Sequence, residues 1–573
     1  GMVALASGSK DKTPQPEATP TPAAPVELTF AVWGSPAEVA AYEAVVTDFN
    51  ASSKDTNVSV EDFPDAATMM AAIRDESVKP NIYLLPRANL AEVIEDKRNV
   101  PLLDLLEARE VPIGDDFGRE AVSAFSVDDD LQCLPYTRSP MVIYYNTALV
   151  DFEAMEAEDL PVPKPDHKSW NMAQFRAAAE FASRPRAKTR GVHIEPTLQG
   201  LAPFIYSGGG KLFDEEDEPT RLALADDSSA SALQQTLEVL RDAQLTLTSQ
   251  QLAQRPALEW FKRGRLGMIA GYRNLTPELR ATQGLDFDVL PMPNLGASQT
   301  IADLNGLCIA PGRNGRVDGS ANFLSYLVTD EVIARLAQTG SIQPTKLTVA
   351  LSKDFLQPDL LPEHSMVFND AVRGIVLPPL TSKGAELTAL IDPEIKALLK
   401  NSGYLAASKA VAAVAALATL AFTGRSLGVL LFGILILITS YAKAASGLSK
   451  FQSWQLIVRY GGPGLAVGNP EQFKSSTGFA AALDLLSGLL GMLAAVLLLP
   501  LIAPLVGIER QYWWLAMAYC ALLPTMGAAT PSGVLRTLDR FDLISWAGTL
   551  APITRAISCG IAFAAGADLP GFV

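Results

Sequence analysis

The stretch VELTFAVWGSPAEVAAYEAVVTDFNASS, residues 26–53, decides the fold class of the first part of the chain. Apolar residues alternate from Leu28 to Val32 and a Gly-Ser-Pro turn signal follows, so the opening segment is a predicted buried β-strand. From Val39 to Phe49 the apolar residues recur three and four positions apart, which predicts an amphipathic helix. A strand followed directly by a helix is the first half of a βαβ unit.

The same pattern continues beyond this unit. TNVSVEDF, residues 56–63, is a second predicted strand, and NIYLLP, residues 81–86, is a third whose continuous apolar run suits a sheet covered on both faces. Strands that alternate with helices imply a doubly wound sheet, in which ligands bind beyond the carboxyl ends of the strands. Trp33 and Arg87 stand at such ends.

Charge divides the chain into two parts. The whole chain has 46 basic and 62 acidic residues. From Lys396 onward there are 12 basic and 6 acidic residues, whereas residues 1–395 carry 34 and 56. The acidic first part argues against nucleic acid as a partner, because binding there needs a basic surface. The basic second part is typical of loops beside a membrane.

The first 25 residues have the composition of a tether. Proline, threonine and alanine dominate from Lys10 to Pro25, and such a segment buries too little apolar surface to fold. MVALA, residues 2–6, resembles the end of a bacterial lipoprotein leader, but Ser9 stands where the lipidated cysteine would be. The sequence therefore predicts an extended linker and supports no claim of a lipid anchor.

Cysteines, histidines and acidic clusters give no metal or cofactor signature. The four cysteines form no CxxC pair; Cys520 and Cys559 are predicted to be buried, while Cys133 and Cys308 either pair or, as the sequence favours, stay free thiols. The three histidines fit no HExxH or triad pattern. DEEDEP, residues 214–219, lacks EF-hand spacing and is interpreted as a solvated loop rather than a calcium site. We expect no metal and no cofactor.

A run of motifs in order resembles family 1 extracellular solute-binding proteins, the sugar-binding type of ABC importers. The resemblance covers roughly residues 26–398. The segments that carry it are LQCLPYTRSPMVIYYNTALV (131–150), SWNMAQFRAAAEFAS (169–183), LAPFIYSGGGKLFDEED (201–217), LEWFKRGRLGMIAGYRN (258–274), FDVLPMPN (287–294), NGLCIAPG (305–312) and ANFLSYLVTDEVIARLAQTGSIQP (321–344).

The resemblance implies a two-lobed α/β periplasmic-binding-protein fold, with crossings between lobes near residues 139 and 300. It implies a carbohydrate ligand, ABC permease subunits as partners, and binding without catalysis. A glycan-acting hydrolase stays open as an alternative, because glycoside hydrolysis needs only two carboxylates. We expect the binding domain to be extracytoplasmic.

Sugars offer flat C–H faces and a rim of hydroxyls, so their sites combine aromatic rings with planar polar groups. The candidate ligand contacts are the aromatic and polar residues at predicted strand ends or loops: Trp33, Arg87, Tyr136, Arg138, Tyr206, Tyr272, Arg273 and Asn305. Trp170 and Trp260 begin or lie in helices and are interpreted as packing residues.

The second part of the chain reads as an all-α transmembrane segment. Apolar runs near the roughly 20 residues that cross a bilayer predict about five spans. They are residues 404–422, 426–442, 479–508, 511–534 and 543–563. Asp484 and Arg555 fall within or at the edges of these runs, where a charge is either functional or placed at a helix end.

This part resembles the opening of Wzx-like polysaccharide flippases, a branch of the MATE-related exporters. The similarity lies in TGRSLGVLLFGILILITSYAKAASGLSKFQSWQLIVRYG, residues 423–461, and ATPSGVLRTLDRFDLISW, residues 529–546. Members of that group have twelve or more helices, so about five helices are only a portion of one. The resemblance also leaves a polysaccharide export component as an alternative function.

The two parts favour opposite sides of a membrane. Basic residues gather in the loops after the second and fourth predicted spans, which places residue 400 in the cytoplasm. A solute-binding domain meets its ligand outside. We therefore interpret the chain as a composite of a tether (1–25), a solute-binding domain (26–398) and a truncated flippase-like membrane domain (399–573), whether a natural fusion, an engineered one or a gene-model error.

Overall fold

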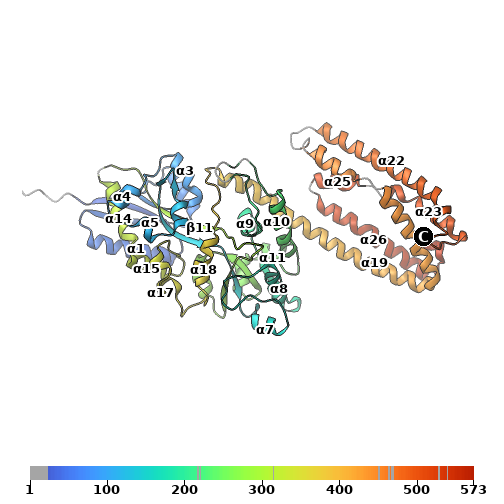
Figure 1. The fold of residues 1–573 in the computed structure, drawn as a ribbon, viewed down its shortest axis with the longest axis horizontal. Helices are drawn as coiled ribbons and strands as arrows, with labels where there is room; N and C mark the ends of the chain where they lie inside the picture. Colours follow the sequence, from blue (N-terminus) through green and yellow to red (C-terminus); the bar gives the residue numbers. More distant parts are fainter. Residues whose placement is uncertain are drawn as a thin grey trace, which may run out of the picture. The chain divides into compact units, whose positions relative to one another are not determined.

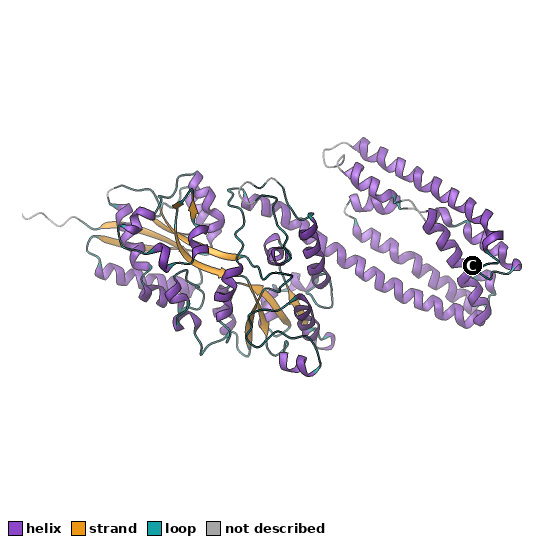
Figure 2. Ribbon diagram, in the orientation of Figure 1, coloured by secondary structure: helices purple, strands orange, loops and turns teal. Residues whose placement is uncertain are grey.

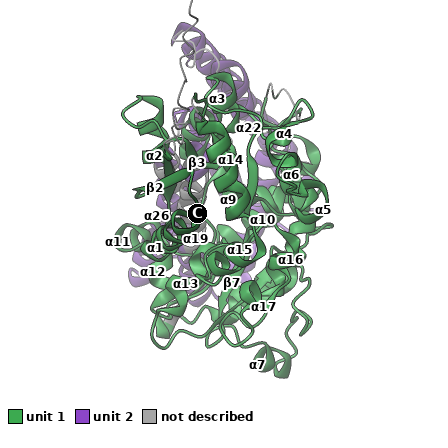
Figure 3. Ribbon diagram, turned by 90° about the vertical axis from the view of Figure 1, so that its left-hand side faces the viewer, with its two compact units in different colours: residues 1–393 green, residues 394–573 purple. Residues whose placement is uncertain are grey.

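The computed structural model describes residues 24–572 except 216–218, 220, 314, 450–451, 463–464, 466–469, 527–528 and 539, and it does not describe the side chains of 185, 397–410, 429, 541, 542 and 545. Most of the predicted tether, residues 1–25, lies outside the described residues. The chain divides into two compact units, Gly1–Pro393 and Glu394–Val573, which are coloured separately in Figure 3.

Unit 1 is built on two larger sheets and a short hairpin (Figure 2). The first sheet has the order β2 (Thr56–Phe63), β1 (Val26–Trp33), β3 (Ile82–Pro86), β11 (Ala302–Ile309) and β6 (Leu134–Pro140). The second has the order β10 (Phe287–Pro291), β7 (Val142–Asn146), β9 (Leu266–Gly271) and β8 (Arg190–His193), and the hairpin pairs β4 (Ser126–Val127) with β5 (Asp130–Leu131). The predicted two-lobed α/β fold is confirmed.

Strands β1, β2 and β3, from which the sequence predicted a doubly wound sheet, form the parallel part of the first sheet. β1 pairs in parallel with β2, from Val26 opposite Thr56 to Trp33 opposite Phe63, and also with β3. β11 runs antiparallel to both β3 and β6. In the second sheet β7 is antiparallel to β9 and β10, and only the β8–β9 pair is parallel.

Helix α1 (Pro36–Ser52) begins where its sequence contains an N-terminal capping box. The Ser35 side chain accepts a hydrogen bond from the Glu38 N–H, and the Glu38 carboxylate accepts one from the Ser35 N–H. Pro36 suits the first helical position because that position needs no N–H donor. The apolar stripe of α1 then packs into the core through Tyr42, Val45, Val46 and Phe49.

Further helices surround the sheets (Figure 1). Those before β6 or after β11 are α2 (Ala66–Arg74), α3 (Leu90–Glu95), α4 (Leu103–Glu107), α5 (Ile113–Asp116), α6 (Arg119–Ala124), α14 (Arg316–Leu327), α15 (Asp330–Ala337), α16 (Leu347–Ala350), α17 (Lys353–Leu356) and α18 (Met366–Ala371). Those between β7 and β10 are α7 (Phe152–Ala157), α8 (Met172–Ala182), α9 (Leu198–Ser207), α10 (Asp227–Leu240), α11 (Ser249–Gln254), α12 (Ala257–Lys262) and α13 (Thr276–Arg280).

The chain passes between the two sheets at two places along its strands. It leaves the first sheet after Pro140 at the end of β6 and enters the second at Val142. It leaves the second sheet after Pro291 and re-enters the first at Ala302. Residues carried by β11 near Ala302 therefore lie close to the passage between the lobes.

Cys133 and Cys308 form a disulfide, so the expectation of free thiols was wrong. Cys133 directly precedes β6, Cys308 lies in the neighbouring β11, and their Cα atoms are 4.5 Å apart. Strand pairing creates this proximity across 175 residues of sequence, which local sequence pattern does not reveal. Cys520 and Cys559 are buried free thiols, as predicted.

Unit 2 contains helices only in its described residues (Figure 1). They are the later part of α19 (Gly384–Ser449), α20 (Ser453–Leu456), η5 (Ile457–Gly461), α22 (Pro470–Ile502), η6 (Arg510–Tyr512), α23 (Trp513–Cys520), α24 (Leu523–Met526), α25 (Thr530–Thr537), α26 (Phe541–Ala564) and η7 (Leu569–Gly571). Gly428 interrupts α19 with φ 68° and ψ 176°, a backbone region that favours glycine.

Four helical stretches in the described part of unit 2 are long and apolar enough to cross a membrane. They are Val411–Gly428, Leu430–Gly461, Pro470–Ile502 and Trp546–Ala564. The predicted span 511–534 is instead divided among α23, α24 and α25. Pro524 and Pro531 each lack an N–H donor, and this accounts for helices that end and restart within the run.

We expect the Cys133–Cys308 disulfide to stabilise unit 1 by about 2–5 kcal/mol, because it restricts a long loop in the unfolded chain. Replacing both cysteines by alanine in the full-length chain should lower the denaturation midpoint of unit 1. The matched control replaces Cys520 and Cys559, which are free, by alanine. Equal midpoints for the wild-type and Cys133/Cys308 variant proteins in the absence of reductant would contradict this expectation.

Candidate functional site

The first-sheet part of the candidate site lies at the ends of β1 and β3. Trp33 is the last residue of β1; it is half-buried, and its indole Nε1–H donates to the Leu84 carbonyl at 3.0 Å. Arg87 follows β3 and donates to the carbonyls of Ala124 (3.1 Å) and Pro378 (2.8 Å). Burial lowers the pKa of Arg87 to about 10. Both side chains are held in place by backbone groups of the protein.

Asn305 and Arg138 come from the paired strands β11 and β6. Asn305 is buried, and its amide donates to Thr137 Oγ1 (3.1 Å) and Asp303 Oδ1 (3.3 Å). Its Oδ1 has no hydrogen-bond partner among the described residues. Arg138 is buried and forms an ion pair with Glu120 through its Nη1 atom. An amide with a spare buried acceptor is a group that a hydroxyl donor would satisfy.

Two carboxylates that the sequence analysis did not identify, those of Asp303 and Glu38, lie near Asn305. Burial raises the pKa of Asp303, the Asn305 hydrogen bond lowers it, and the charge of Glu38 raises it further. Asp303 precedes Asn305 by two positions on β11, so both side chains lie on the same face of the strand. That spacing is the signal that would have identified Asp303. For Glu38, at the start of α1, the local sequence indicates a helix-capping role and gives no sign that its charge lies near Asp303.

Tyr272 and Gln199 bring the second sheet's elements to the same place. Tyr272 follows β9 and is half-buried, and its hydroxyl accepts a hydrogen bond from Gln199 Nε2 at 2.9 Å. Its carbonyl accepts one from the Tyr144 hydroxyl at 2.8 Å. Burial raises the pKa of Tyr272, and the charge of Asp303 adds to this effect. Asp303 pairs with Ser139 across β11 and β6, and the Ser139 hydroxyl accepts a hydrogen bond (2.7 Å) from the N–H of Arg273, the residue after Tyr272. Asp303 and Tyr272 therefore lie near each other across the lobes.

Three remaining candidates lie elsewhere or deeper. Tyr136 is buried, with its ring centroid 6.4 Å from that of Tyr42. Tyr206 is half-buried near the end of α9. Arg273 has no exposed surface, and its guanidinium donates to Gly340 O (2.9 Å), Ser365 Oγ (3.3 Å) and Phe355 O (3.2 Å). Tyr136 and Arg273 are enclosed by protein, so neither side chain is open to a ligand between the lobes.

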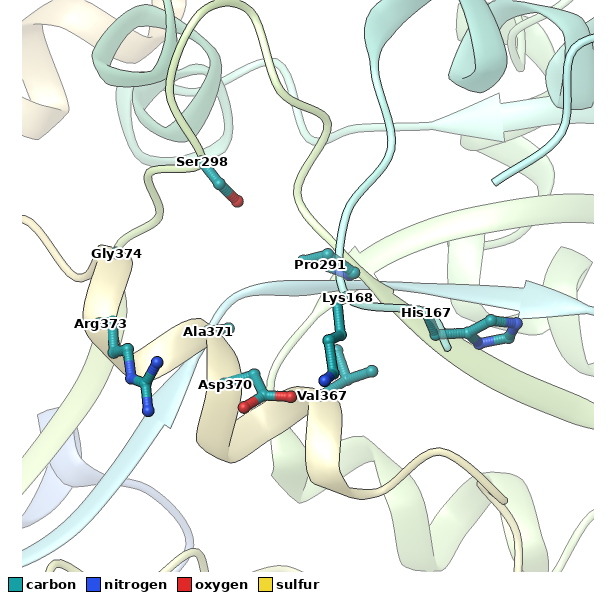
Figure 4. A pocket seen from close by; sticks show the side chains of 9 residues that line it. All are labelled: His167, Lys168, Pro291, Ser298, Val367, Asp370, Ala371, Arg373 and Gly374. Atoms are coloured by element: carbon teal, nitrogen blue, oxygen red, sulfur yellow. The ribbon is translucent and has the colours of Figure 1, made fainter. Parts of the chain in front are cut away.

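A separate cavity of about 190 Å³ lies between β10 and the α18 region. Figure 4 shows Lys168 and Asp370 directed toward its interior, Arg373 at one side and His167 at the other. None of the eight residues predicted to contact a ligand lines this cavity.

In unit 2, Asp484 is buried in α22 and its carboxylate is fully engaged. It accepts hydrogen bonds from Ser453 Oγ (2.5 Å), the N–H groups of Ala529 (2.8 Å) and Thr530 (2.7 Å), and Thr530 Oγ1 (2.7 Å). Arg555 is exposed on α26. The contacts of Asp484 connect α20, α22 and α25, so its carboxylate stabilises the packing of these three helices.

The architecture of unit 1 defines a class, the two-lobed solute-binding proteins, and solved structures share it. The ABC substrate-binding protein Lmo0181 from Listeria monocytogenes, in complex with cycloalternan, is 16% identical with a TM-score of 0.58, covering 66% of this chain and 94% of that chain. The GacH receptor of Streptomyces glaucescens is 19% identical with a TM-score of 0.52, covering 66% and 93%. The Thermus thermophilus maltotriose binding protein is 16% identical with a TM-score of 0.50, covering 66% and 94%.

The family model of the bacterial extracellular solute-binding protein matches residues 44–362, more than half of the chain. The chain therefore belongs to the bacterial extracellular solute-binding protein family.

The C-terminal helices are related to a different protein. The inner membrane protein YghQ of Escherichia coli (strain K12) is 38% identical over 172 residues, which are 30% of this chain and 48% of that protein. The chain thus spans about half the length of this curated relative.

We expect Arg273 to support stability rather than ligand binding. Arg273→Met keeps the aliphatic stem but leaves three buried acceptors without their donor, which should lower the free energy of unfolding by about 2–5 kcal/mol. The matched control is Arg263→Met, at an exposed arginine. Chemical denaturation measures both variants. Unchanged stability of Arg273→Met together with a loss of ligand affinity would contradict this assignment.

Proposed function

We propose that residues 26–398 bind a neutral oligosaccharide between the two lobes and deliver it to an ABC permease. The observation that carries the proposal is the grouping of Asp303 and Asn305 on β11 with Tyr272 and Gln199 from the other lobe, which the hydrogen bond from Arg273 N–H to Ser139 Oγ brings together. This grouping combines an aromatic ring with carboxylate and amide groups, which is the chemistry that a sugar ring and its hydroxyls need. Relatives of the same fold were solved with cycloalternan, acarbose and maltotriose.

The charge of the site supports a neutral ligand over an acidic one. Burial raises the pKa of Asp303, and the like charge of Glu38 raises it further. A carboxylate of a uronic acid placed there would add a third negative charge in a poorly solvated position. Sugar hydroxyls, by contrast, donate hydrogen bonds to carboxylates without a charge penalty.

The second candidate function, glycan hydrolysis, rests on the same pair of carboxylates, because a glycosidase uses two such groups. Incubating the full-length protein with a labelled oligosaccharide separates the two functions. Intact ligand recovered after binding supports a binding protein, whereas release of shorter labelled products supports the hydrolase.

We expect Trp33→Ala and Tyr272→Ala each to weaken oligosaccharide binding by about 1–3 kcal/mol, roughly 5- to 150-fold, because an aromatic ring no longer covers a sugar face. Calorimetric titration of the full-length protein with maltotriose, other neutral oligosaccharides and a uronate-containing oligosaccharide measures this. Trp260→Ala is the matched control: Trp260 is also half-buried and donates to a backbone carbonyl, that of Gln251, but lies outside the site.

Two results would contradict the proposal. One is a wild-type protein that binds peptides or amino acids but no sugar in the panel. The other is a loss of affinity in Trp260→Ala that equals the losses in Trp33→Ala and Tyr272→Ala.

For residues 399–573 we propose a membrane-embedded, flippase-like portion that anchors the binding domain. The apolar helices Val411–Gly428 and Pro470–Ile502 expose large hydrophobic side chains that a bilayer would cover, Leu417 at 66% and Leu501 at 68% among them. The relationship to YghQ supports a membrane location. Because the chain spans about half of that relative, transport of a lipid-linked sugar by this portion alone is not part of the proposal, and a role in polysaccharide export is its alternative.

We propose that the binding domain lies outside the cytoplasm, against the charge bias of the membrane loops. The Cys133–Cys308 disulfide supports this location, since disulfides form and persist in oxidising compartments. The bias of basic residues favours the opposite side, but it governs short loops, and long domains translocate largely regardless of charge. Unit 1, Gly1–Pro393, is such a long domain.

We expect protease added to intact spheroplasts to remove unit 1. We also expect Cys133 and Cys308 to resist a thiol-reactive maleimide until a reductant is added. Cys520 and Cys559, which are free, serve as the internal control because the denatured chain should react at these two positions without reductant. Digestion of unit 1 only in inside-out vesicles, with all four cysteines reactive, would place the binding domain in the cytoplasm.

A further inference from the structure

Two of the chain's three histidines converge on one buried carboxylate. His167 lies in the loop before α8, Asp288 lies in β10, and His364 lies just before α18. His364 Nδ1 is 2.5 Å from Asp288 Oδ2, and His167 Nδ1 is 3.7 Å from the same oxygen. The two imidazole rings stack with centroids 3.7 Å apart. Three separate segments thus bring two imidazole rings and one carboxylate, all potential metal ligands, close together.

The spacing of these donors suits a metal ion. One ligand atom from each of the three residues lies within 4.8 Å of the others. Donors bound at about 2.0–2.2 Å to a tetrahedral ion stand about 3.4 Å apart, so the observed 2.5 and 3.7 Å separations lie on either side of the required value. The two rings are stacked with 24° between their planes, and His167 Nδ1 also lies 3.2 Å from the Val289 carbonyl. Metal binding therefore requires one imidazole to turn out of the stack until its ring nitrogen points at the ion.

The surroundings hold the carboxylate in position. Asp288 Oδ1 accepts hydrogen bonds from the N–H of Val289 (2.9 Å) and the N–H of His364 (3.0 Å), which leaves Oδ2 facing the imidazoles. Backbone donors to a ligating carboxylate are the kind of outer contact that orients metal ligands. His167 and Asp288 are buried, and His364 is partly exposed.

The site also has a neighbouring space for a further ligand. His167 borders the cavity of about 190 Å³ (Figure 4). Neither Asp288 nor His364 lines that cavity, so a water molecule that completes a coordination sphere begun by three protein ligands enters beside the partly exposed His364. Imidazole nitrogens combined with one carboxylate match Zn²⁺ and similar transition ions, whereas Ca²⁺ and Mg²⁺ prefer oxygen ligands throughout.

We propose that His167, Asp288 and His364 form a binding site for a divalent transition-metal ion of the Zn²⁺ class. The ion takes the place of the hydrogen bond between His364 Nδ1 and Asp288 Oδ2. The Nδ1 proton leaves to solvent from an imidazolium, or moves to Nε2 in the neutral ring, and the freed lone pair binds the ion. The ion joins the loop before α8, strand β10 and the segment that returns from α17 to α18. Its effect is to fasten that returning segment to the second sheet.

The test uses the full-length, tag-free protein in detergent after treatment with a chelator, with Co²⁺ as the probe. We expect Co²⁺ to give the intense visible absorption of a tetrahedral site, to saturate near one ion per chain, and to be displaced by Zn²⁺. His167→Gln and His364→Gln should each weaken Co²⁺ binding by about 100-fold or more, beyond the 10- to 100-fold typical of changes to outer contacts. His193→Gln is the matched control, since His193 is also buried but pairs with Glu195.

A conservative variant separates ligation from folding. His364→Cys retains a metal ligand, so it should recover Co²⁺ binding and add the near-ultraviolet charge-transfer band of a cobalt–thiolate bond. A purely structural histidine would give no such band. The proposal is overturned if the wild-type protein takes up no Co²⁺, if its uptake is the same in His167→Gln and His364→Gln, or if His364→Cys binds Co²⁺ without the thiolate band.

Discussion

Unit 1 depends on the placement of one strand, β11. This strand returns from the second sheet and enters the first between β3 and β6, antiparallel to both. β6 joins the sheet only through β11. The strand that leads out of the first sheet is therefore kept in that sheet by the strand that returns to it. The Cys133–Cys308 disulfide fastens the same pair of segments. Bringing Cys133 and Cys308 together closes a loop across 175 residues, which is costly in chain entropy. The β6–β11 pairing and the disulfide both offset that cost.

The position of the candidate site follows from that strand. Asp303 and Asn305 lie at the start of β11, directly after the chain has left the second sheet. A carboxylate and an amide on a central strand are more rigidly held than groups on a loop. Tyr272 lies at the end of β9, next to Arg273, whose N–H donates to Ser139, the residue opposite Asp303. The strand that joins the lobes therefore also supplies the polar groups that a ligand between them would meet.

Local pattern predicted the local elements well and the distant contacts poorly. The expected strand at 56–63 has the observed bounds of β2, and the expected helix after Trp33 is α1. The Cys133–Cys308 bond and the meeting of His167 with His364 depend on segments far apart in sequence, for which periodicity carries no information. Arg273 and Tyr272 show a finer limit. Both follow the same strand end, yet Arg273 turns inward to three buried acceptors, a difference that only packing decides.

The interruption of the span predicted at 511–534 and the burial of Asp484 are parts of one feature. In a continuous helix, each interior N–H is used by the carbonyl four residues earlier. The N–H groups of the first turn have no such partner, and α25 begins at Thr530. The free N–H groups of Ala529 and Thr530 therefore point to the Asp484 carboxylate, with the Thr530 and Ser453 hydroxyls completing its contacts. A buried charge in an apolar helix is costly without such partners, and a continuous span would not have supplied them.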